Sequence, residues 1–153
     1  MTNEILPTPA SRVVLVDARD DRRQLMRNVV GGDDAKSLLV GEADSSAAAL
    51  AVVSEQQADV VILDVQMPLS EGLVTIAALR QSHPHLGIIV CSFDLDQATV
   101  QRVLDQGADM CLAKPVGRMD VLAALGRLRD DRQGAGQQPD GVLTAAGATA
   151  TSG

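Results

Sequence analysis

The sequence predicts one α/β domain, in which a parallel sheet is covered by helices on both faces. Five short apolar segments alternate along the chain with five segments that carry helix signals. Several of the apolar segments are apolar at consecutive positions rather than at every second position, as expected of strands buried on both faces. The 153 residues are enough for one such domain and a short remainder.

The five predicted strands are rich in Val, Ile and Leu. In chain order they are Arg12–Asp17, Ser37–Glu42, Asp59–Asp64, Gly87–Ser92 and Asp109–Ala113. The first, third and fourth are apolar at consecutive positions, which indicates burial on both faces of the sheet.

The predicted helices follow the strands, one after each. In chain order they are Asp20–Val30, Ser45–Gln57, Leu73–Ser82, Leu95–Gln106 and Arg118–Arg132. Acidic residues open the first helix and a pair of serines opens the second, and both suit a helix N-terminus. Glycine or proline follows the first, third and fourth, where a helix is expected to stop. The last helix has an apolar stripe, which we interpret as a core-facing surface rather than a membrane anchor.

The predicted domain spans residues 11–132, between two segments without a periodic pattern. Residues 1–10 are predicted to be a flexible N-terminal segment, without the basic start and apolar run of a signal peptide. Residues 133–153 are rich in Gly, Ala and Thr and are predicted to be disordered.

The composition excludes several classes of function. A net charge of −7 opposes direct binding to nucleic acid, and a single Phe with no Tyr or Trp leaves little for base stacking. No apolar run is long enough to span a bilayer. Two cysteines, Cys91 and Cys111, make no disulfide framework and are expected to be buried small residues. We therefore expect a cytoplasmic protein that binds neither nucleic acid nor membrane.

Four residues with reactive side chains end four different predicted strands: Asp17, Asp64, Ser92 and Lys114. In an open parallel sheet, ligands bind beyond the carboxyl ends of the strands. A single Asp or Ser at such a position is often only a helix cap or a turn residue. Two carboxylates, a hydroxyl and an ammonium together favour a site.

The chemistry of such a set is that of phosphoryl transfer. Two facing carboxylates are unfavourable unless a cation lies between them, and Mg²⁺ prefers oxygen ligands. A carboxylate can act as a nucleophile toward phosphorus. The transferred group mainly requires neutralisation of its charge, which Mg²⁺ and Lys114 would supply, while Ser92 would donate a hydrogen bond.

The motifs around these residues resemble a known family. They are VVLVD ending at Asp17, VVILDVQMP around Asp64, VCS ending at Ser92 and LAKP around Lys114. Over about residues 11–132 the chain is similar to the receiver domain of two-component response regulators. The resemblance implies a flavodoxin-like, doubly wound (βα)5 fold with strand order 2-1-3-4-5.

The resemblance also implies a role for each residue. Asp64 would accept a phosphoryl group from a sensor histidine kinase or a phosphotransfer protein. Mg²⁺ would be held by Asp17, Asp64 and the backbone carbonyl of Gln66, and Ser92 and Lys114 would contact the phosphate. The peptide bond after the lysine, to Pro115, would be cis.

Three positions depart from the family pattern. Ala18 replaces the usual second acid, so Mg²⁺ binding is predicted to be weak; Asp20 and Asp21 are better explained as helix-start charges. Phe93 stands where the family usually has a small residue. It either covers the phosphorylation pocket or forms part of a docking surface, or it is a core or surface ring without a special role. Cys111 replaces an aromatic residue that moves on activation in many receivers, so that coupling is not available.

The sequence is compatible with three functions to different degrees. The first is a stand-alone receiver that, when phosphorylated, switches a surface for a downstream protein around the loop after Ser92, with a homodimer as a further option. The alternative is a degenerate receiver that binds proteins independently of phosphorylation. A phosphatase-like enzyme with an aspartyl nucleophile is disfavoured, because Gln66 is not an acid and no cap domain defines a substrate. We therefore expect a regulatory protein and not an enzyme.

Overall fold

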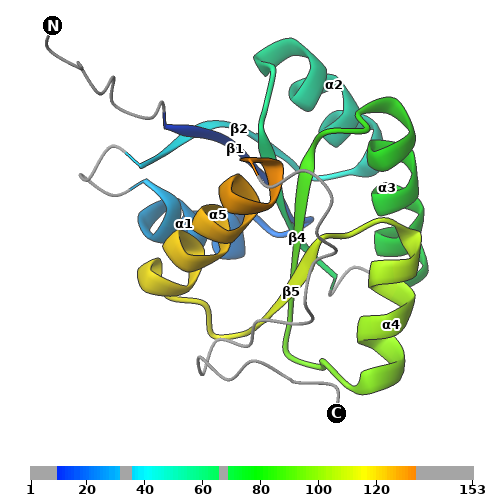
Figure 1. The fold of residues 1–153 in the computed structure, drawn as a ribbon. Helices are drawn as coiled ribbons and strands as arrows, with labels where there is room; N and C mark the ends of the chain where they lie inside the picture. Colours follow the sequence, from blue (N-terminus) through cyan, green and yellow to red (C-terminus); the bar gives the residue numbers. More distant parts are fainter. Residues whose placement is uncertain (1–9, 32–35, 66–68, 134–153) are drawn as a thin grey trace, which may run out of the picture.

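The computed structural model describes residues 10–31, 36–65 and 69–133. The segments predicted to be a flexible N-terminus and a disordered tail fall almost entirely outside these residues, as does Gln66. Within the described part, strands and helices alternate along the chain as predicted (Figure 1). They are β1 (Ser11–Val16), α1 (Asp20–Val30), β2 (Ser37–Ala43), α2 (Ser46–Gln56), β3 (Val60–Asp64), α3 (Leu69–Ser82), β4 (Gly87–Ser92), α4 (Gln97–Gln106), β5 (Met110–Ala113) and α5 (Arg118–Gln133).

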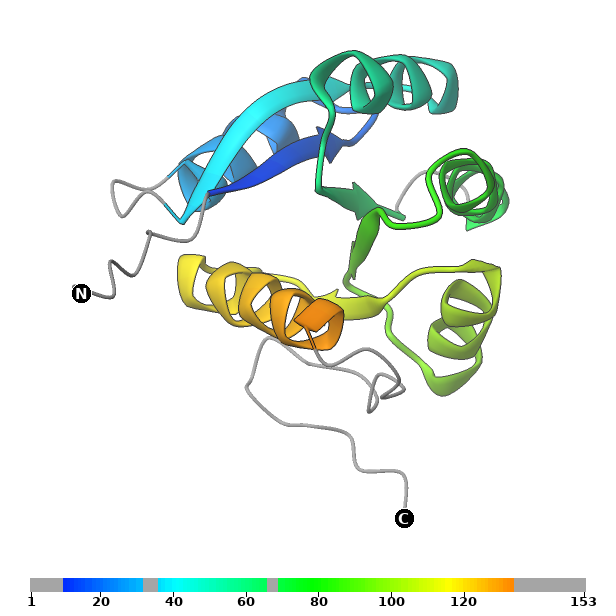
Figure 2. The same cartoon turned by 45° about the horizontal axis from the view of Figure 1, so that its top comes forward.

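The strands form one parallel sheet in the order β2-β1-β3-β4-β5. This confirms the predicted fold class and strand order. Helices α1 and α5 cover one face of the sheet, and α2, α3 and α4 cover the other (Figure 2). No helix in the described ranges is long and apolar enough to cross a membrane.

Two separate aliphatic cores lie on the two faces of the sheet, because successive residues of a strand point to opposite sides. On β3, Val61 and Leu63 face α2, α3 and α4, while Val60 and Ile62 face α1 and α5. Every residue of β3 is buried, which is why this segment is apolar at consecutive positions.

Helix α3 begins at Leu69, one turn earlier than the predicted start at Leu73. Gly72 lies inside this first turn, in close contact with the residue that follows β3. A Cβ atom added at Gly72 would lie 2.5 Å from Cγ1 of Val65. The glycine is therefore part of the helix and allows it to pack closely at this point, although a glycine normally weakens a helix prediction.

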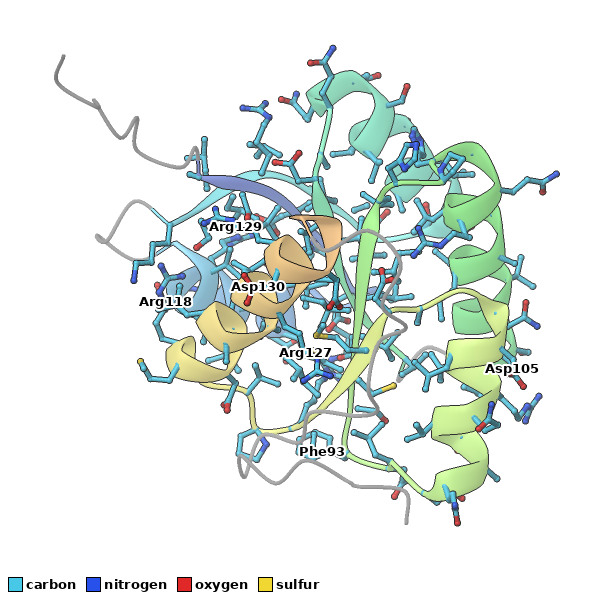
Figure 3. All side chains as sticks on the ribbon, viewed as in Figure 1. Phe93, Asp105, Arg118, Arg127, Arg129 and Asp130 are labelled. Atoms are coloured by element: carbon cyan, nitrogen blue, oxygen red, sulfur yellow. The ribbon has the colours of Figure 1, made fainter. Side chains whose placement is uncertain are left out.

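Arginine side chains join the ends of the elements. Arg80 of α3 donates hydrogen bonds to the carbonyl oxygens of Pro84, Leu86 and Gly107 and forms an ion pair with Asp109. On the other face, two arginines of α5 point toward α1 and β2 (Figure 3). Arg118 donates to the carbonyl oxygens of Val29 and Val30 and to Ser37 Oγ, and Arg129 donates to Ser11 Oγ and to the carbonyl of Lys36.

Candidate functional site

The sheet places the four predicted site residues at one edge. Asp17 directly follows β1, Asp64 and Ser92 are the last residues of β3 and β4, and Lys114 directly follows β5. Because the strands are parallel and in register, all four lie at the carboxyl end of the sheet. Asp17, Asp64 and Ser92 are buried there, which is unusual for polar side chains that have no function or partner.

Asp64 is the centre of a compact charged cluster. Its Oδ2 atom forms an ion pair with Nζ of Lys114, and both side chains are largely shielded from solvent. A second cation reaches the same oxygen, since Nη1 of Arg22 lies 3.4 Å from Asp64 Oδ2. Arg22 belongs to the first turn of α1. The sequence interpretation did not include Arg22, although its place in the first turn of the helix that follows Asp17 was a possible signal.

Asp17 lies beside Asp64, and its environment favours the protonated form. Burial, followed by the hydrogen bond and the charge of Asp64, raises the pKa of Asp17 to about 6. The backbone N–H of Arg19 donates to Asp17 Oδ1 at 2.9 Å and, with the charge of Arg22, acts in the opposite direction. Two carboxyl groups this close together repel each other unless positive charge lies between or beside them.

Asp20 and Asp21 do not take part in this cluster. Asp20 forms ion pairs with Arg23 and Arg27, and Asp21 pairs with Arg19. These contacts agree with the interpretation of both acids as helix-start charges. Ala18, where the family carries a second acid, is exposed.

Ser92 is buried and is engaged with the loop that follows β4. Its hydroxyl accepts a hydrogen bond from the backbone N–H of Asp94 at 3.1 Å and lies 3.4 Å from the carbonyl oxygen of the same residue. The hydroxyl group therefore holds the start of the β4–α4 loop in this structure.

Phe93 follows Ser92 and lies at the edge of the molecule where β4 ends (Figure 3). Its side chain is 61% exposed, so it is not a core ring. The Nζ atom of Lys114 lies 5.4 Å from the centroid of the ring, within the range of a cation–π contact. Of the roles considered for Phe93, burial in the core is wrong, and a position beside the site is what the structure shows.

A cavity of about 340 Å³ opens beside the charged cluster. Its polar end is formed by Asp17, Asp64, Arg22 and Lys114, and its apolar wall by residues of β1, β3, β4, α1 and the segment after β5. Phe93 also lines it. The site is therefore open to an incoming group from the side of α1 and the β5–α5 loop.

The described residues fit Mg²⁺ only through Asp17 and Asp64. Both are buried carboxylates at one edge, and Mg²⁺ is commonly held by one or two carboxylates together with waters. No group of three or more His, Cys, Asp or Glu side chains is arranged for a metal in the part of the chain that the structure describes. The predicted ligand at Gln66 lies outside that part.

Two further predictions concern the two cysteines and the peptide bond before Pro115. The Lys114–Pro115 peptide bond is cis, as the resemblance implied. Cys91 and Cys111 are buried free thiols, and burial raises the pKa of each to about 12. They are small core residues, and neither carries a thiolate at neutral pH.

Comparison with known proteins agrees with this geometry. Residues 13–126 match the response regulator receiver domain family. A chemotaxis protein CheY from Listeria monocytogenes is 30% identical over 114 residues, which cover 74% of this chain and 94% of that protein. A protein-glutamate methylesterase/protein-glutamine glutaminase from Cereibacter sphaeroides is 32% identical over 115 residues, which cover 74% of this chain but only 31% of the relative. The chain thus spans about a third of the length of such methylesterases.

Among solved structures, the chain is similar to the signal receiver domain of the response regulator NarL from Mycobacterium tuberculosis. The TM-score is 0.71 at 29% sequence identity, with 80% of this chain and 98% of that one covered. The receiver domain of RcsB from Salmonella enterica, solved with the phosphomimetic BeF3−, shares the fold with a TM-score of 0.68 at 24% identity, over 79% of this chain and 89% of that one.

Proposed function

The chain belongs to the response regulator receiver domain family, and from this premise we propose that Asp64 accepts a phosphoryl group from a histidine kinase or a phosphotransfer protein. Receiver domains are regulatory, and they interact with such donors and with downstream targets. The observation that carries the proposal is the buried ion pair of Lys114 with Asp64 beside Asp17. It combines a nucleophile with a cation that can neutralise the acquired charge.

The proposed transfer is a simple exchange of bonds. One carboxylate oxygen of Asp64 forms a bond to phosphorus, while the bond between phosphorus and the nitrogen of the donor phosphohistidine breaks. The nitrogen leaves with the bonding electron pair, and Asp64 becomes an acyl phosphate. Lys114 already contacts Asp64 Oδ2, so its ammonium group is in place to pair with the phosphoryl oxygens.

Receiver domains typically bind Mg²⁺ at the phosphorylation site, and Asp17 and Asp64 are the described side chains that would hold it here. When bound, the ion neutralises charge on the phosphoryl group. The absence of an acid at Ala18 makes weak binding part of the proposal.

The proposed switch involves the β4–α4 loop. The hydroxyl of Ser92 is occupied by the backbone of Asp94, so a phosphoryl group that recruits this hydroxyl must compete with the start of the loop. The resulting change would pass to Phe93 and α4, which follow directly. The surface formed by this loop, α4 and β5 is our proposed binding surface for a downstream protein or a second copy of the chain.

We test phosphoacceptance with beryllofluoride and Mg²⁺. The wild type is expected to form an adduct, seen as bound beryllofluoride in ¹⁹F NMR, and Asp64→Asn is expected to form none. With acetyl phosphate, intact-mass spectrometry should show one added phosphoryl group on the wild type alone. If wild type and Asp64→Asn behave alike at millimolar Mg²⁺, the proposal is wrong.

Two observations favour a second candidate, a degenerate receiver that binds its partner without phosphorylation. Arg22 lies against Asp64, and Ala18 supplies no acid. This candidate predicts no detectable Mg²⁺ binding and the same partner affinity for wild type and Asp64→Asn. A low-millimolar or tighter Mg²⁺ dissociation constant would count against it.

We also propose that the domain works as a stand-alone, cytoplasmic protein. Its match to nearly the whole of a CheY supports the first part, and the acidic net charge of the chain is compatible with the second. Immunoblots of fractionated cells should find a protein of the size of this chain in the cytosolic fraction.

A further inference from the structure

The charged cluster at Asp64 contains more positive charge than the predicted site required. Two carboxylates, Asp17 and Asp64, face two cations, Lys114 and Arg22. The formal charges of these four side chains sum to zero when all are ionised. A divalent cation would therefore enter a cluster that the chain has already balanced by itself.

Arg22 is the cation that stands in a position to compete with a metal ion. Its Nη1 atom lies 3.4 Å from Asp64 Oδ2, and its charge also acts on Asp17. It thus contacts one of the two carboxylates that would bind a metal and acts through its charge on the other. Lys114 approaches Asp64 from the end of β5, on the other side of the β3 strand from Asp17.

The guanidinium of Arg22 is also partly shielded from solvent. The side chain of Arg22 is 29% exposed and lines the cavity next to Asp17 and Asp64. The neighbouring Arg23 is bound elsewhere, to Glu42, Asp20 and the backbone carbonyl of Asp17. Arg19 pairs with the exposed Asp21. Of these three arginines, Arg22 alone has an ion pair with Asp64 among the described contacts.

We infer that Arg22 is a built-in competitor of divalent cations, so that its guanidinium balances the Asp17–Asp64 pair without metal and must move before a metal ion can bind both carboxylates. This inference rests on the proposed function only in taking the acid pair as the metal site. Weak metal binding then has two separate causes. One is the missing acid at Ala18, and the other is the positive charge of Arg22.

The test measures metal binding directly, without any phosphoryl chemistry. Mn²⁺ serves as the probe through water proton relaxation, and Mg²⁺ is followed by isothermal titration calorimetry, since the chain has no Trp or Tyr to report by fluorescence. Arg22→Gln removes the guanidinium, and Arg19→Gln is the matched control, because the Arg19 side chain is exposed and pairs with Asp21 at the same end of α1. Arg22→Lys keeps the charge.

Arg22→Gln is expected to bind Mn²⁺ and Mg²⁺ at least about tenfold more tightly than the wild type, the scale on which groups around a metal change its affinity. Arg19→Gln and Arg22→Lys should stay within about threefold of the wild type. Adding Asp17→Asn to Arg22→Gln should abolish the gain. Circular dichroism melting curves should show that each variant is folded.

Four results would overturn the inference. They are an Arg22→Gln variant that binds metal no better than the wild type, an equal gain from Arg19→Gln, a gain that survives Asp17→Asn, and no metal binding in any variant. A failure of the proposed function is seen separately, as an absence of the beryllofluoride adduct on Asp64 in both wild type and Arg22→Gln, whatever their metal affinities.

Discussion

At the scale of one residue, Asp17 shows that ionising a carboxyl group in this site is unfavourable. It is 6% exposed and lies against another carboxylate, so ionising it in the folded protein is harder than in the unfolded chain. A bound cation would remove this difficulty. Arg22 and Lys114 balance the formal charge of the cluster, but the pKa of Asp17 stays raised, so without metal the folded protein is less stable at neutral pH than it would be with an unperturbed Asp17.

The pH dependence of this loss has a definite sign. Between about pH 4 and pH 6 the folded protein keeps a proton on Asp17 that the unfolded chain has released, since the pKa rises from 3.8 to about 6 on folding. The contribution of Asp17 to the free energy of unfolding therefore falls as the pH rises through this window and stays low above it.

In EDTA, Asp17→Asn should become more stable relative to the wild type as the pH rises from 4 to 7, by up to about 3 kcal/mol. The difference between the two proteins is the quantity to measure, by urea unfolding, because other acids titrate too. Glu42, for example, has its pKa lowered by Arg27 and loses stability in the opposite direction, as the pH falls. A difference that does not change with pH would contradict the pKa assigned to Asp17.

At the scale of elements, Arg80 connects the end of α3 to the α3–β4 and α4–β5 loops. Its guanidinium accounts for three backbone carbonyls, from Pro84, Leu86 and Gly107, and for the carboxylate of Asp109. Gly107 lies directly under the Arg80 side chain, with φ of +123° and room for no Cβ. One side chain thus fixes the start of β4 and the end of α4 relative to α3.

Arg80→Met should lower the free energy of unfolding by about 2–3 kcal/mol, because it leaves carbonyl groups and a charged partner without their donor. Arg102→Met, an exposed arginine on α4, is the control and should change it by less than about 0.5 kcal/mol. Beryllofluoride binding at Asp64 should be retained in both, since Arg80 lies at the amino ends of β4 and β5. Chemical denaturation measures the first effect, and a loss below about 1 kcal/mol would show that Arg80 is not a structural connector.

At the scale of the whole molecule, the sheet separates two cores that share no buried side chains. Ile76 of α3 belongs to the core under α2, α3 and α4, and Ile89 of β4 belongs to the core under α1 and α5. Both are fully buried. The absence of buried aromatic rings means that both cores depend on many small aliphatic contacts.

Ile76→Val and Ile89→Val should each lower the free energy of unfolding by about 0.5–1.5 kcal/mol. The double variant should show the sum within about 0.5 kcal/mol, because the two side chains belong to separate cores on opposite faces of the sheet. Equilibrium unfolding with a single transition is expected for all three, since the sheet is common to both cores. A large deviation from the sum would indicate that the two faces are energetically coupled through β4.

The sequence was sufficient for the fold and for most of the site, for a physical reason. Apolar runs, caps and strand-final polar residues are local signals, and a parallel sheet brings the ends of its strands together whatever the details of packing. Asp17, Asp64 and Lys114 could therefore be placed together from the sequence alone. Their roles remain proposals.

Two features could not be predicted in the same way. The direction of Arg22 depends on the rotamer of a long side chain and on which neighbouring acids already have partners, such as Asp20 and Asp21 with Arg19, Arg23 and Arg27. The first turn of α3 lies before the predicted start at Leu73, and no local sequence signal shows that Gly72 allows the close contact with Val65. Both depend on packing between elements.

The position of Phe93 has a practical consequence for watching the site at work. It is the only Phe in a chain without Tyr or Trp, so its ring gives a proton NMR signal with no aromatic neighbours other than the two histidine rings. Lys114 lies over that ring and against Asp64 at the same time. Any ligand that draws the ammonium group away from the ring will shift this signal. The unlabelled protein thus contains its own spectroscopic probe of whether Asp64 is occupied.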